Sequence, residues 1–144
     1  MVVKVEIQRR KGKMDLSKLE AAVKGRDKVA VGWMGAEAEK ATVNEFGSPK
    51  GHVPERPALR NAMRDNLGKY RAALQDAARA VIRGEKTMEQ ALGELGPDAV
   101  KDIQNEIAAM ATPPNSPETV RTKGADNPLV DEGALGKAVK HEVR

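Results

Sequence analysis

Two short stretches of the chain alternate between apolar and polar residues. In residues 2–8 the apolar side chains fall at every second position, and residues 28–34 repeat the pattern with Trp33 on the apolar face. A period of two residues is typical of a strand with one buried face. Residues 139–143 could add a final edge strand. The pattern therefore predicts a small sheet, antiparallel or mixed, with a short helix between its first two strands.

That short helix is expected between Asp15, which is suited to cap its first turn, and Gly25, which is suited to its end. Leu16, Leu19 and Val23 share one side of the helix. We expect this side to face the core, because apolar residues at helical spacing form the buried stripe of an amphipathic helix.

In the middle of the chain, apolar residues recur at steps of three and four, which is the period of an amphipathic helix. The longest such pattern covers residues 57–82 and predicts a long central helix across the sheet. Thr87 and Gln90 have the spacing of a capping box, so further helices are expected up to residue 111. Gly96-Pro97 is expected to divide that part into two helices.

Residues 44–60, here called the elbow, connect the strand-like half to the helical half. A helix over residues 36–44 is expected to stop at Gly47, because glycine readily adopts the positive φ of a helix end. Pro54 stiffens the loop that follows. Pro57 suits the first turn of the next helix. The elbow should therefore fix how the two halves are oriented.

Three side chains of the elbow have roles that the sequence suggests. Phe46 is the only Phe of the chain, and we expect it to anchor the core. Glu45 is expected to be a solvated carboxylate at a helix end, and Arg56 could hold Glu45 or a neighbouring carboxylate. Arg56-Pro57 has two interpretations, a rigid helix start or a direct role at an interface.

Residues 113–128 are polar and rich in Pro, Gly, Asn and Lys, without apolar periodicity. Such a stretch is long for a loop in a compact domain, and long loops are usually functional or disordered. Residues 112–130 are therefore predicted to form an extended C-terminal arm. Asp131 is placed to cap a short helix that contains Leu135 and Val139.

A length of 144 residues suits one domain with a core of its own. The prediction is a single α+β domain, in which a small sheet is packed by a long central helix and followed by extra helices and the extended arm. Its parts are the sheet with its short helix (2–34), the helical part (57–111), the arm (112–130), and a short helix with a final strand (131–144).

The chain has one Trp, one Tyr and one Phe, so its core must be aliphatic and rich in Ala. Such a core buries modest area, and partner subunits can supply further burial. The absence of cysteine excludes disulfides and thiolate metal sites. No apolar run approaches the roughly 20 residues that span a bilayer, and charges begin too early for a signal peptide. We expect a protein that is soluble where it is made and has no membrane partner.

The sequence lacks the usual signatures of catalysis. His52 and His141 are the two histidines, and neither has the spacing of a metal site. No serine lies in a nucleophile motif, and the glycines form no phosphate-binding loop. We therefore expect no enzymatic activity, no metal and no cofactor.

Two segments together resemble the small neck and tail-completion proteins of tailed bacteriophages and prophages. The first is Asn44-Glu45-Phe46-Gly47 followed by Val53-Pro54-Glu55-Arg56-Pro57-Ala58-Leu59-Arg60. The second runs from Pro114-Asn115-Ser116-Pro117 through Lys123-Gly124 and Pro128-Leu129 to Asp131-Glu132-Gly133-Ala134-Leu135. The resemblance covers roughly residues 28–64 and 112–143. It departs at Ala58, where the family commonly has an aromatic residue, and at Glu132, where it has Thr.

The resemblance implies a structural virion protein, made in the host cytoplasm, whose copies form a closed homo-oligomeric ring, expected to be a hexamer, at the head–tail junction. The ring would complete the tail and permit attachment of the head. Implied partners are other neck and tail proteins (connector or stopper, tail tube or terminator) and genomic DNA passing through the lumen. The implied interface residues are Glu45, Phe46, Gly47, Pro54, Arg56, Pro57, Arg60, Ser116, Thr119, Lys123, Gly124, Pro128, Leu129, Asp131, Gly133 and Leu135.

Two other functions stay open. The nearest is a tail terminator ring that caps the tail tube, which contact with the last tube ring would reveal. The other class is a basic DNA-binding regulator. The net charge is +4, and residues 50–86 hold nine Lys or Arg against four Asp or Glu. Duplex binding that weakens steeply with salt would support a regulator.

Overall fold

The computed structural model describes residues 16–124, 128 and 133–144. The strand expected at residues 2–8, the caps expected at Asp15 and Asp131, and the predicted interface residue Leu129 lie outside the described residues. In chain order the elements are α1 (Leu16–Val23), β1 (Val29–Trp33), α2 (Glu37–Phe46), α3 (Ala58–Asp65), α4 (Leu67–Ile82), α5 (Met88–Ala109), α6 (Pro117–Lys123), α7 (Ala134–Lys137) and β2 (Val139–Val143).

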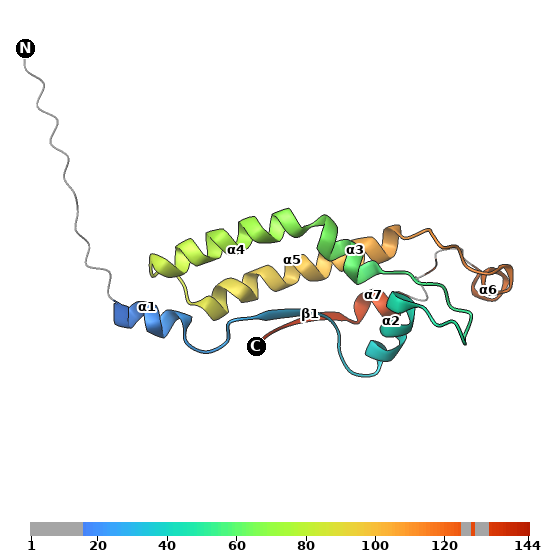
Figure 1. Ribbon diagram of the computed structural model, residues 1–144, viewed down its shortest axis with the longest axis horizontal. Helices are drawn as coiled ribbons and strands as arrows, with labels where there is room; N and C mark the ends of the chain where they lie inside the picture. The colour runs from blue at the N-terminus through green and yellow to red at the C-terminus, as the bar shows by residue number, and fades with distance from the viewer. Residues whose placement is uncertain (1–15, 125–127, 129–132) are drawn as a thin grey trace, which may run out of the picture.

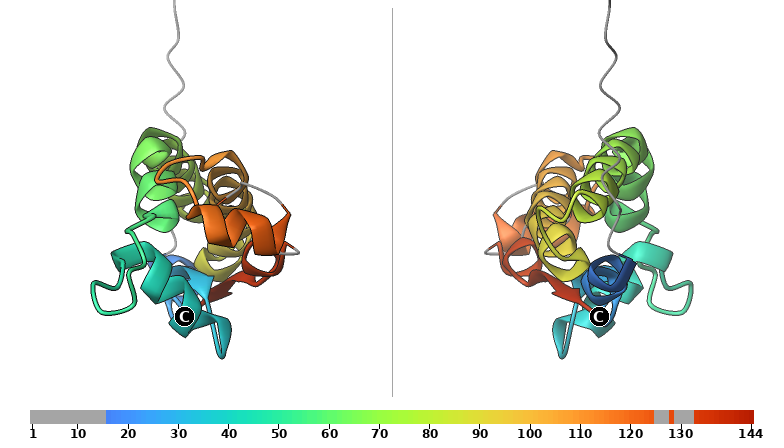
Figure 2. Two further views of the ribbon diagram at one scale, coloured as in Figure 1. Left: turned by 90° about the vertical axis from the view of Figure 1, so that its right-hand side faces the viewer. Right: turned by 90° about the vertical axis from the view of Figure 1, so that its left-hand side faces the viewer.

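The chain folds around α5, the long central helix of an elongated molecule (Figure 1). Strands β1 and β2 form a two-stranded antiparallel sheet that packs against α5. The α3–α4 pair also packs against α5, and the end-on views show these helices side by side above the strands (Figure 2). The mixed α+β fold with a sheet on a long central helix is therefore confirmed, although that helix is α5 and not the expected helix over residues 57–82.

The sheet joins two ends of the described chain. Val29 pairs with Val143 and Trp33 with Val139, so both strand predictions that fall on described residues are confirmed. The Trp33 indole Nε1 donates a hydrogen bond to the Leu135 carbonyl oxygen at 2.8 Å. Buried Trp usually needs such a partner for its N–H. This bond attaches α7 to the first strand.

The core is aliphatic and rich in Ala, as the scarcity of aromatic residues predicts. Ile103 and Ile107 of α5 lie at its centre with exposed fractions of 0% and 2%. They contact the small residues Ala58 and Ala62 of α3, together with Val139 of β2. Because these α3 residues are small, α3 and α5 can approach closely. The space between them therefore needs few large side chains to fill it.

The expected single helix over residues 57–82 is wrong, because two helices, α3 and α4, meet at Asn66. The backbone of Asn66 leaves the helical region at φ −103° and ψ 10°. Its backbone N–H and its side-chain Nδ2 both donate to the Ala62 carbonyl oxygen, at 3.2 and 2.9 Å. Asn side chains compete in this way for backbone partners. A break of one residue leaves the apolar period nearly intact, so periodicity alone misses it.

The expected division at Gly96-Pro97 is also wrong, because α5 continues through both residues. The capping box at Thr87 and Gln90 is confirmed, with both of its hydrogen bonds present. Pro97 removes one intrahelical hydrogen bond. The buried stripe that includes Ile103 continues on both sides of it. Burial of this stripe outweighs the local cost of proline.

The expected extended arm is wrong for residues 117–123, which form α6. The Ser116 hydroxyl accepts a hydrogen bond from the Thr119 backbone N–H at 3.2 Å, Pro117 occupies the first turn, and Gly124 ends the helix in a left-handed conformation. These are strong start and stop signals. They form a helix here although no apolar stripe accompanies it.

Helix α1 lies at one end of the molecule (Figure 1). Its residues Leu16 and Val23 were expected to face the core, but they are 63% and 42% exposed. The expectation is wrong because, among the described elements, α1 packs mainly against α4 and α5, and this contact leaves Leu16 and Val23 largely uncovered. The short helix expected near Leu135 is confirmed as α7, whereas Val139 begins β2 rather than ending that helix.

Candidate functional site

The elbow is held by a buried carboxylate. Glu45, near the end of α2, is 4% exposed, and its Oε2 accepts a hydrogen bond from the Leu59 backbone N–H at 3.0 Å. Its Oε1 accepts from the backbone N–H of Arg60 at 2.9 Å and from the Arg60 Nε at 3.1 Å. The first N–H groups of a helix have no intrahelical partner and favour negative charge. Glu45 of α2 therefore caps the start of α3.

This arrangement corrects three expectations. Glu45 is buried rather than solvated, and its cationic partner is Arg60 rather than Arg56. Phe46 does not anchor the core, because it is 64% exposed and its ring lies under the Arg60 guanidinium, 5.1 Å from the ring centroid. Successive helix residues point about 100° apart. Turning Glu45 inward to meet α3 therefore turns Phe46 outward.

Gly47 and Pro57 shape the loop between α2 and α3. Gly47 has the expected positive φ of 71°, but its ψ of 172° differs from the left-handed helical conformation that a glycine at a helix end often adopts. A Cβ at this position would lie 3.0 Å from the Glu55 backbone nitrogen. Pro57 precedes the first residue of α3 rather than occupying its first turn. Only glycine fits the close return of the loop at residue 47.

Arg56 ties the elbow to a segment more than fifty residues later. Its side chain is buried, with 6% of the residue exposed. The Arg56 Nε donates to the Pro113 carbonyl oxygen at 3.1 Å, and Nη2 donates to the Pro114 carbonyl oxygen at 3.1 Å and to Asn115 Oδ1 at 3.4 Å. Burial lowers the pKa of Arg56. The rigid fork of guanidinium donors suits this set of acceptors, which a lysine could not match.

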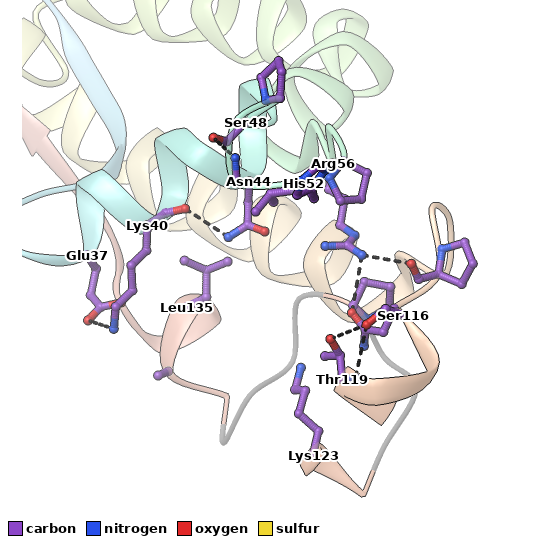
Figure 3. A pocket seen from close by; sticks show the side chains of 18 residues that line it. Glu37, Lys40, Asn44, Ser48, His52, Arg56, Ser116, Thr119, Lys123 and Leu135 are labelled. Atoms are coloured by element: carbon purple, nitrogen blue, oxygen red, sulfur yellow. Dashed lines mark hydrogen bonds and ion pairs between the residues drawn. The ribbon is translucent and has the colours of Figure 1, made fainter. Parts of the chain in front are cut away.

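Beside Arg56 lies a cleft of about 1050 Å³ (Figure 3). It is bounded by α2, by the loop between α2 and α3, by residues 114–123, and by α7. The residues that line this cleft are Glu37, Lys40, Asn44, Ser48, Pro49, Gly51, His52, Val53, Pro54, Arg56, Pro114, Asn115, Ser116, Thr119, Lys123, Pro128, Ala134 and Leu135.

The cleft brings together much of the interface predicted by resemblance. Seven of those residues line it, namely Pro54, Arg56, Ser116, Thr119, Lys123, Pro128 and Leu135. Glu45, Gly47, Pro57 and Arg60 build the elbow behind it. Gly124 and Gly133 have left-handed conformations next to α6 and α7. Phe46 is on the surface of α2, and Leu129 and Asp131 lie outside the described residues.

Sequence reasoning missed several residues of the cleft. Glu37, Lys40, Asn44 and Ser48 follow one another at steps of three and four, which puts them on one side of α2 and its continuation. Lys40 pairs with Glu37 at 3.4 Å. This polar stripe was visible in the sequence, but a polar stripe on a helix usually faces solvent. Nothing in the sequence indicates that residues 114–119 lie opposite it.

The charged side chains of the cleft are mainly cationic. Among the described residues that line it, Lys40, Arg56 and Lys123 carry positive charge and Glu37 carries negative charge. His52 has a positive φ of 53° and is exposed. The described part of the chain contains no group of three or more acidic, His or Cys side chains that could hold a metal ion. Within the described residues, no helix is both long and apolar enough to cross a membrane.

No protein-family model matches the chain, and neither curated proteins nor solved structures give a significant match to it.

Proposed function

We propose that this chain is a structural subunit of a tailed phage particle. Copies of it would form a closed ring, expected to be a hexamer, at the head–tail junction, where the ring completes the tail and permits attachment of the head. In this proposal its partners are neck and tail proteins, with genomic DNA passing through the lumen. It catalyses no reaction, and its work is done by binding surfaces.

One observation carries the proposal beyond the sequence motifs. The two segments that resemble tail-completion proteins are separated by more than fifty residues, yet the Arg56 guanidinium joins them through Pro113, Pro114 and Asn115. Motif residues from both segments then line one cleft. Residues scattered by chance along the chain need not converge in this way. The motifs therefore behave as parts of one surface, which supports an interface role.

A tail terminator ring remains the alternative of the same class, because it too is a ring of subunits of similar size. The DNA-binding regulator is less well supported. Of the nine cations in residues 50–86, six form ion pairs, namely Arg60, Arg64, Lys69, Arg79, Arg83 and Lys86. A seventh, Arg56, is buried. A phosphate would therefore have to compete with a carboxylate for each of these six cations.

The proposal is tested by locating the chain in tailed particles produced from the genome that encodes it. We expect mass spectrometry of purified particles to find a fixed small number of copies, and labelled particles to carry the chain at the head–tail junction. Contact with the last ring of the tail tube alone would indicate the terminator instead. A stable monomer that is absent from particles would overturn the proposal.

A matched pair of variants tests whether the cleft is needed. Arg56→Lys keeps the charge but cannot make the forked contacts to residues 113–115, so we expect particles to incorporate it poorly. Arg71→Lys, an equivalent change at an exposed position of α4, should be incorporated normally. Both variants must first show wild-type circular dichroism. Equal incorporation of the two would count against a role of the cleft in assembly.

A further inference from the structure

The cleft beside Arg56 is rich in hydrogen-bond donors (Figure 3). The side chains of Lys40, Arg56 and Lys123 reach it from three different segments of the chain. Among the described residues that line the cleft, Glu37 is the only carboxylate, and it already pairs with Lys40 at 3.4 Å. The described lining therefore carries a surplus of positive charge.

The Arg56 guanidinium has no counter-charge within the described part of the chain. Its three hydrogen bonds go to two backbone carbonyl oxygens and to the neutral Oδ1 of Asn115. These bonds reduce the cost of burying the cation, but they leave its charge unneutralised. Charges attract more strongly where water is excluded. An anion that reaches this guanidinium would therefore be held more tightly than one beside an exposed arginine.

Donors next to Arg56 are left without an acceptor. Among the described residues, Asn115 Nδ2 is the buried side-chain atom that has no hydrogen-bond partner, although such groups are normally paired. The hydroxyls of Ser116 and Thr119 lie 2.8 Å apart and share one hydrogen bond, so one of their two protons is left for a further acceptor. The cleft is therefore matched to a ligand that carries negative charge and several acceptor atoms.

We propose that the cleft binds a carboxylate of an acidic peptide segment that belongs to another protein. This inference rests on the interface function proposed above and gives the chemistry of the partner. A carboxylate has two acceptor oxygens, so it can accept from the Arg56 guanidinium and from a neighbouring donor together. A rotation of the Asn115 side chain brings Nδ2 to the same anion.

The cleft suits a peptide better than a free anion. Its volume of about 1050 Å³ is at the upper end of the usual range for small-molecule sites. Apolar surface between the charges is supplied by Pro49, Pro54, Pro114, Pro128 and Leu135. A second copy of this chain is a poor source of the carboxylate, because most of its described Asp and Glu side chains already form ion pairs.

Titration of the isotope-labelled protein with hexaglutamate at low salt, followed by NMR, tests the site directly. We expect hexaglutamate to bind at least about tenfold more tightly than hexaglutamine, because hydrogen bonds to a charged partner are stronger than neutral ones. The resonances of the Asn115 side-chain amide and the Arg56 Nε–H should shift. Inorganic phosphate and a DNA duplex are titrated in parallel. Tighter binding of either at these two resonances would assign the cleft to phosphate and overturn the proposal.

Asn115→Asp is the sharpest variant, because it is nearly isosteric and places a carboxylate beside the Arg56 guanidinium. We expect it to weaken hexaglutamate binding by at least about tenfold. Lys40→Gln should weaken it less, since Lys40 is exposed. Lys140→Gln is the control, because Lys140 is also exposed but does not line the cleft. Circular dichroism verifies that all variants are folded. Equal affinity of all three variants would overturn the proposal.

The remaining outcomes separate the partner from the proposed function. If hexaglutamate binds only after Asp126, Asp131 and Glu132 are replaced by their amides, carboxylates of the same chain occupy the cleft and the proposal is wrong. If the chain is found at the head–tail junction but hexaglutamate does not bind, the acidic partner is wrong and the ring stands. Binding as expected by a chain that is absent from particles would leave the carboxylate site standing and overturn the ring.

Discussion

At the scale of single residues, buried charges organise the elbow. Glu45 and Arg56 are the two charged residues of the described chain that are almost completely buried. Burying a charge is costly unless hydrogen bonds satisfy it. Glu45 has three such bonds from Leu59 and Arg60, and Arg56 has three to residues 113–115. Each charge therefore fixes one junction between segments that are distant in sequence.

The first prediction concerns Glu45. Replacing it by Gln removes the negative charge and places an amide N–H₂ among donors, so we expect the free energy of unfolding to fall by about 2 kcal/mol. Glu39→Gln, at an exposed position of the same helix, should change it by less than about 0.5 kcal/mol. Urea unfolding followed by circular dichroism measures both. Equal stability of the two variants would mean that the cap of α3 is unimportant.

The second prediction concerns Asp102 on α5. Burial alone would raise the pKa of Asp102, but hydrogen bonds from Lys69 and Tyr70 outweigh burial and hold it below its usual value. The Tyr70 hydroxyl donates to Asp102 Oδ2 at 2.7 Å, and burial followed by this bond raises the pKa of Tyr70. A lowered carboxyl pKa gives stability that is present above the unfolded value of about 3.9 and lost as pH falls through the folded value.

We therefore expect Asp102→Asn to be less stable than wild type by about 1–2 kcal/mol at pH 7. The difference should stay constant down to about pH 5 and shrink below about pH 4 as the wild-type carboxylate becomes protonated. Urea unfolding at a series of pH values measures it. Asp98→Asn, an exposed carboxylate of the same helix, is the control. A difference that grows on acidification would contradict the assigned direction of the pKa.

At the scale of elements, local signals were readable and long-range ones were not. The strand at residues 139–143 and the capping box at Thr87 followed from short patterns whose physics is local. The ends of α3 and the continuity of α5 did not follow from such patterns, because they depend on which neighbouring elements bury each side of the helix. Asn66 and Pro97 show the two errors: a weak breaker that ends a helix, and a strong breaker that does not.

The candidate site divides in the same way. Its motif residues were identified from sequence, whereas their partners were not. Arg56 bonds to carbonyl oxygens at Pro113 and Pro114, which carry no side-chain signal. Phe46 was assigned to the core because aromatic residues are usually buried. The position of Phe46 is set instead by Glu45, which turns inward to cap the start of α3. This capping contact exists only once α2 and α3 are packed together.

The third prediction tests the packing of α5 against β2. A Cβ at Gly96 would lie 2.2 Å from the His141 ring, whereas nothing lies within 4 Å of one at Gly93. Gly93→Ala should therefore stabilise the protein by up to about 1 kcal/mol through helix propensity. Gly96→Ala should lose that gain, because His141 must move and because a non-glycine residue before Pro97 resists the helical conformation.

Thermal unfolding of the two alanine variants measures the contrast, and the double variant G96A/H141A separates its causes. If the His141 ring is responsible, its removal should restore most of the stability of Gly96→Ala relative to His141→Ala alone. If stability is not restored, the restriction before Pro97 is the main cause. Equal stabilisation by Gly93→Ala and Gly96→Ala would show that β2 does not approach α5 closely at residue 96.

At the scale of the whole molecule, the net charge is +4, and many of the cationic side chains form ion pairs. Several exposed pairs, such as Arg79 with Asp76 and Arg83 with Glu85, each contribute little to stability. The basic excess of residues 50–86 is reduced instead by three carboxylates from outside that stretch: Glu45 pairs with Arg60, Asp102 with Lys69, and Glu94 with Lys86. The surface there is therefore less basic than the sequence suggested. That matters for the choice between a ring subunit and a regulator that binds DNA.

The fourth prediction follows from this distribution. Each cation that neutralises a phosphate adds about −0.9 to the slope of log K against log salt for duplex DNA. With most cations of residues 50–86 engaged, we expect a slope no steeper than about −3 in a fluorescence titration of duplex at low salt. Arg71→Glu reverses one charge on α4. If DNA touches that helix, this variant should make the slope less steep by about 0.9, the value of one lost phosphate contact. A slope near −6 or steeper would mean that the paired cations exchange their carboxylates for phosphates, and would favour the regulator over the ring.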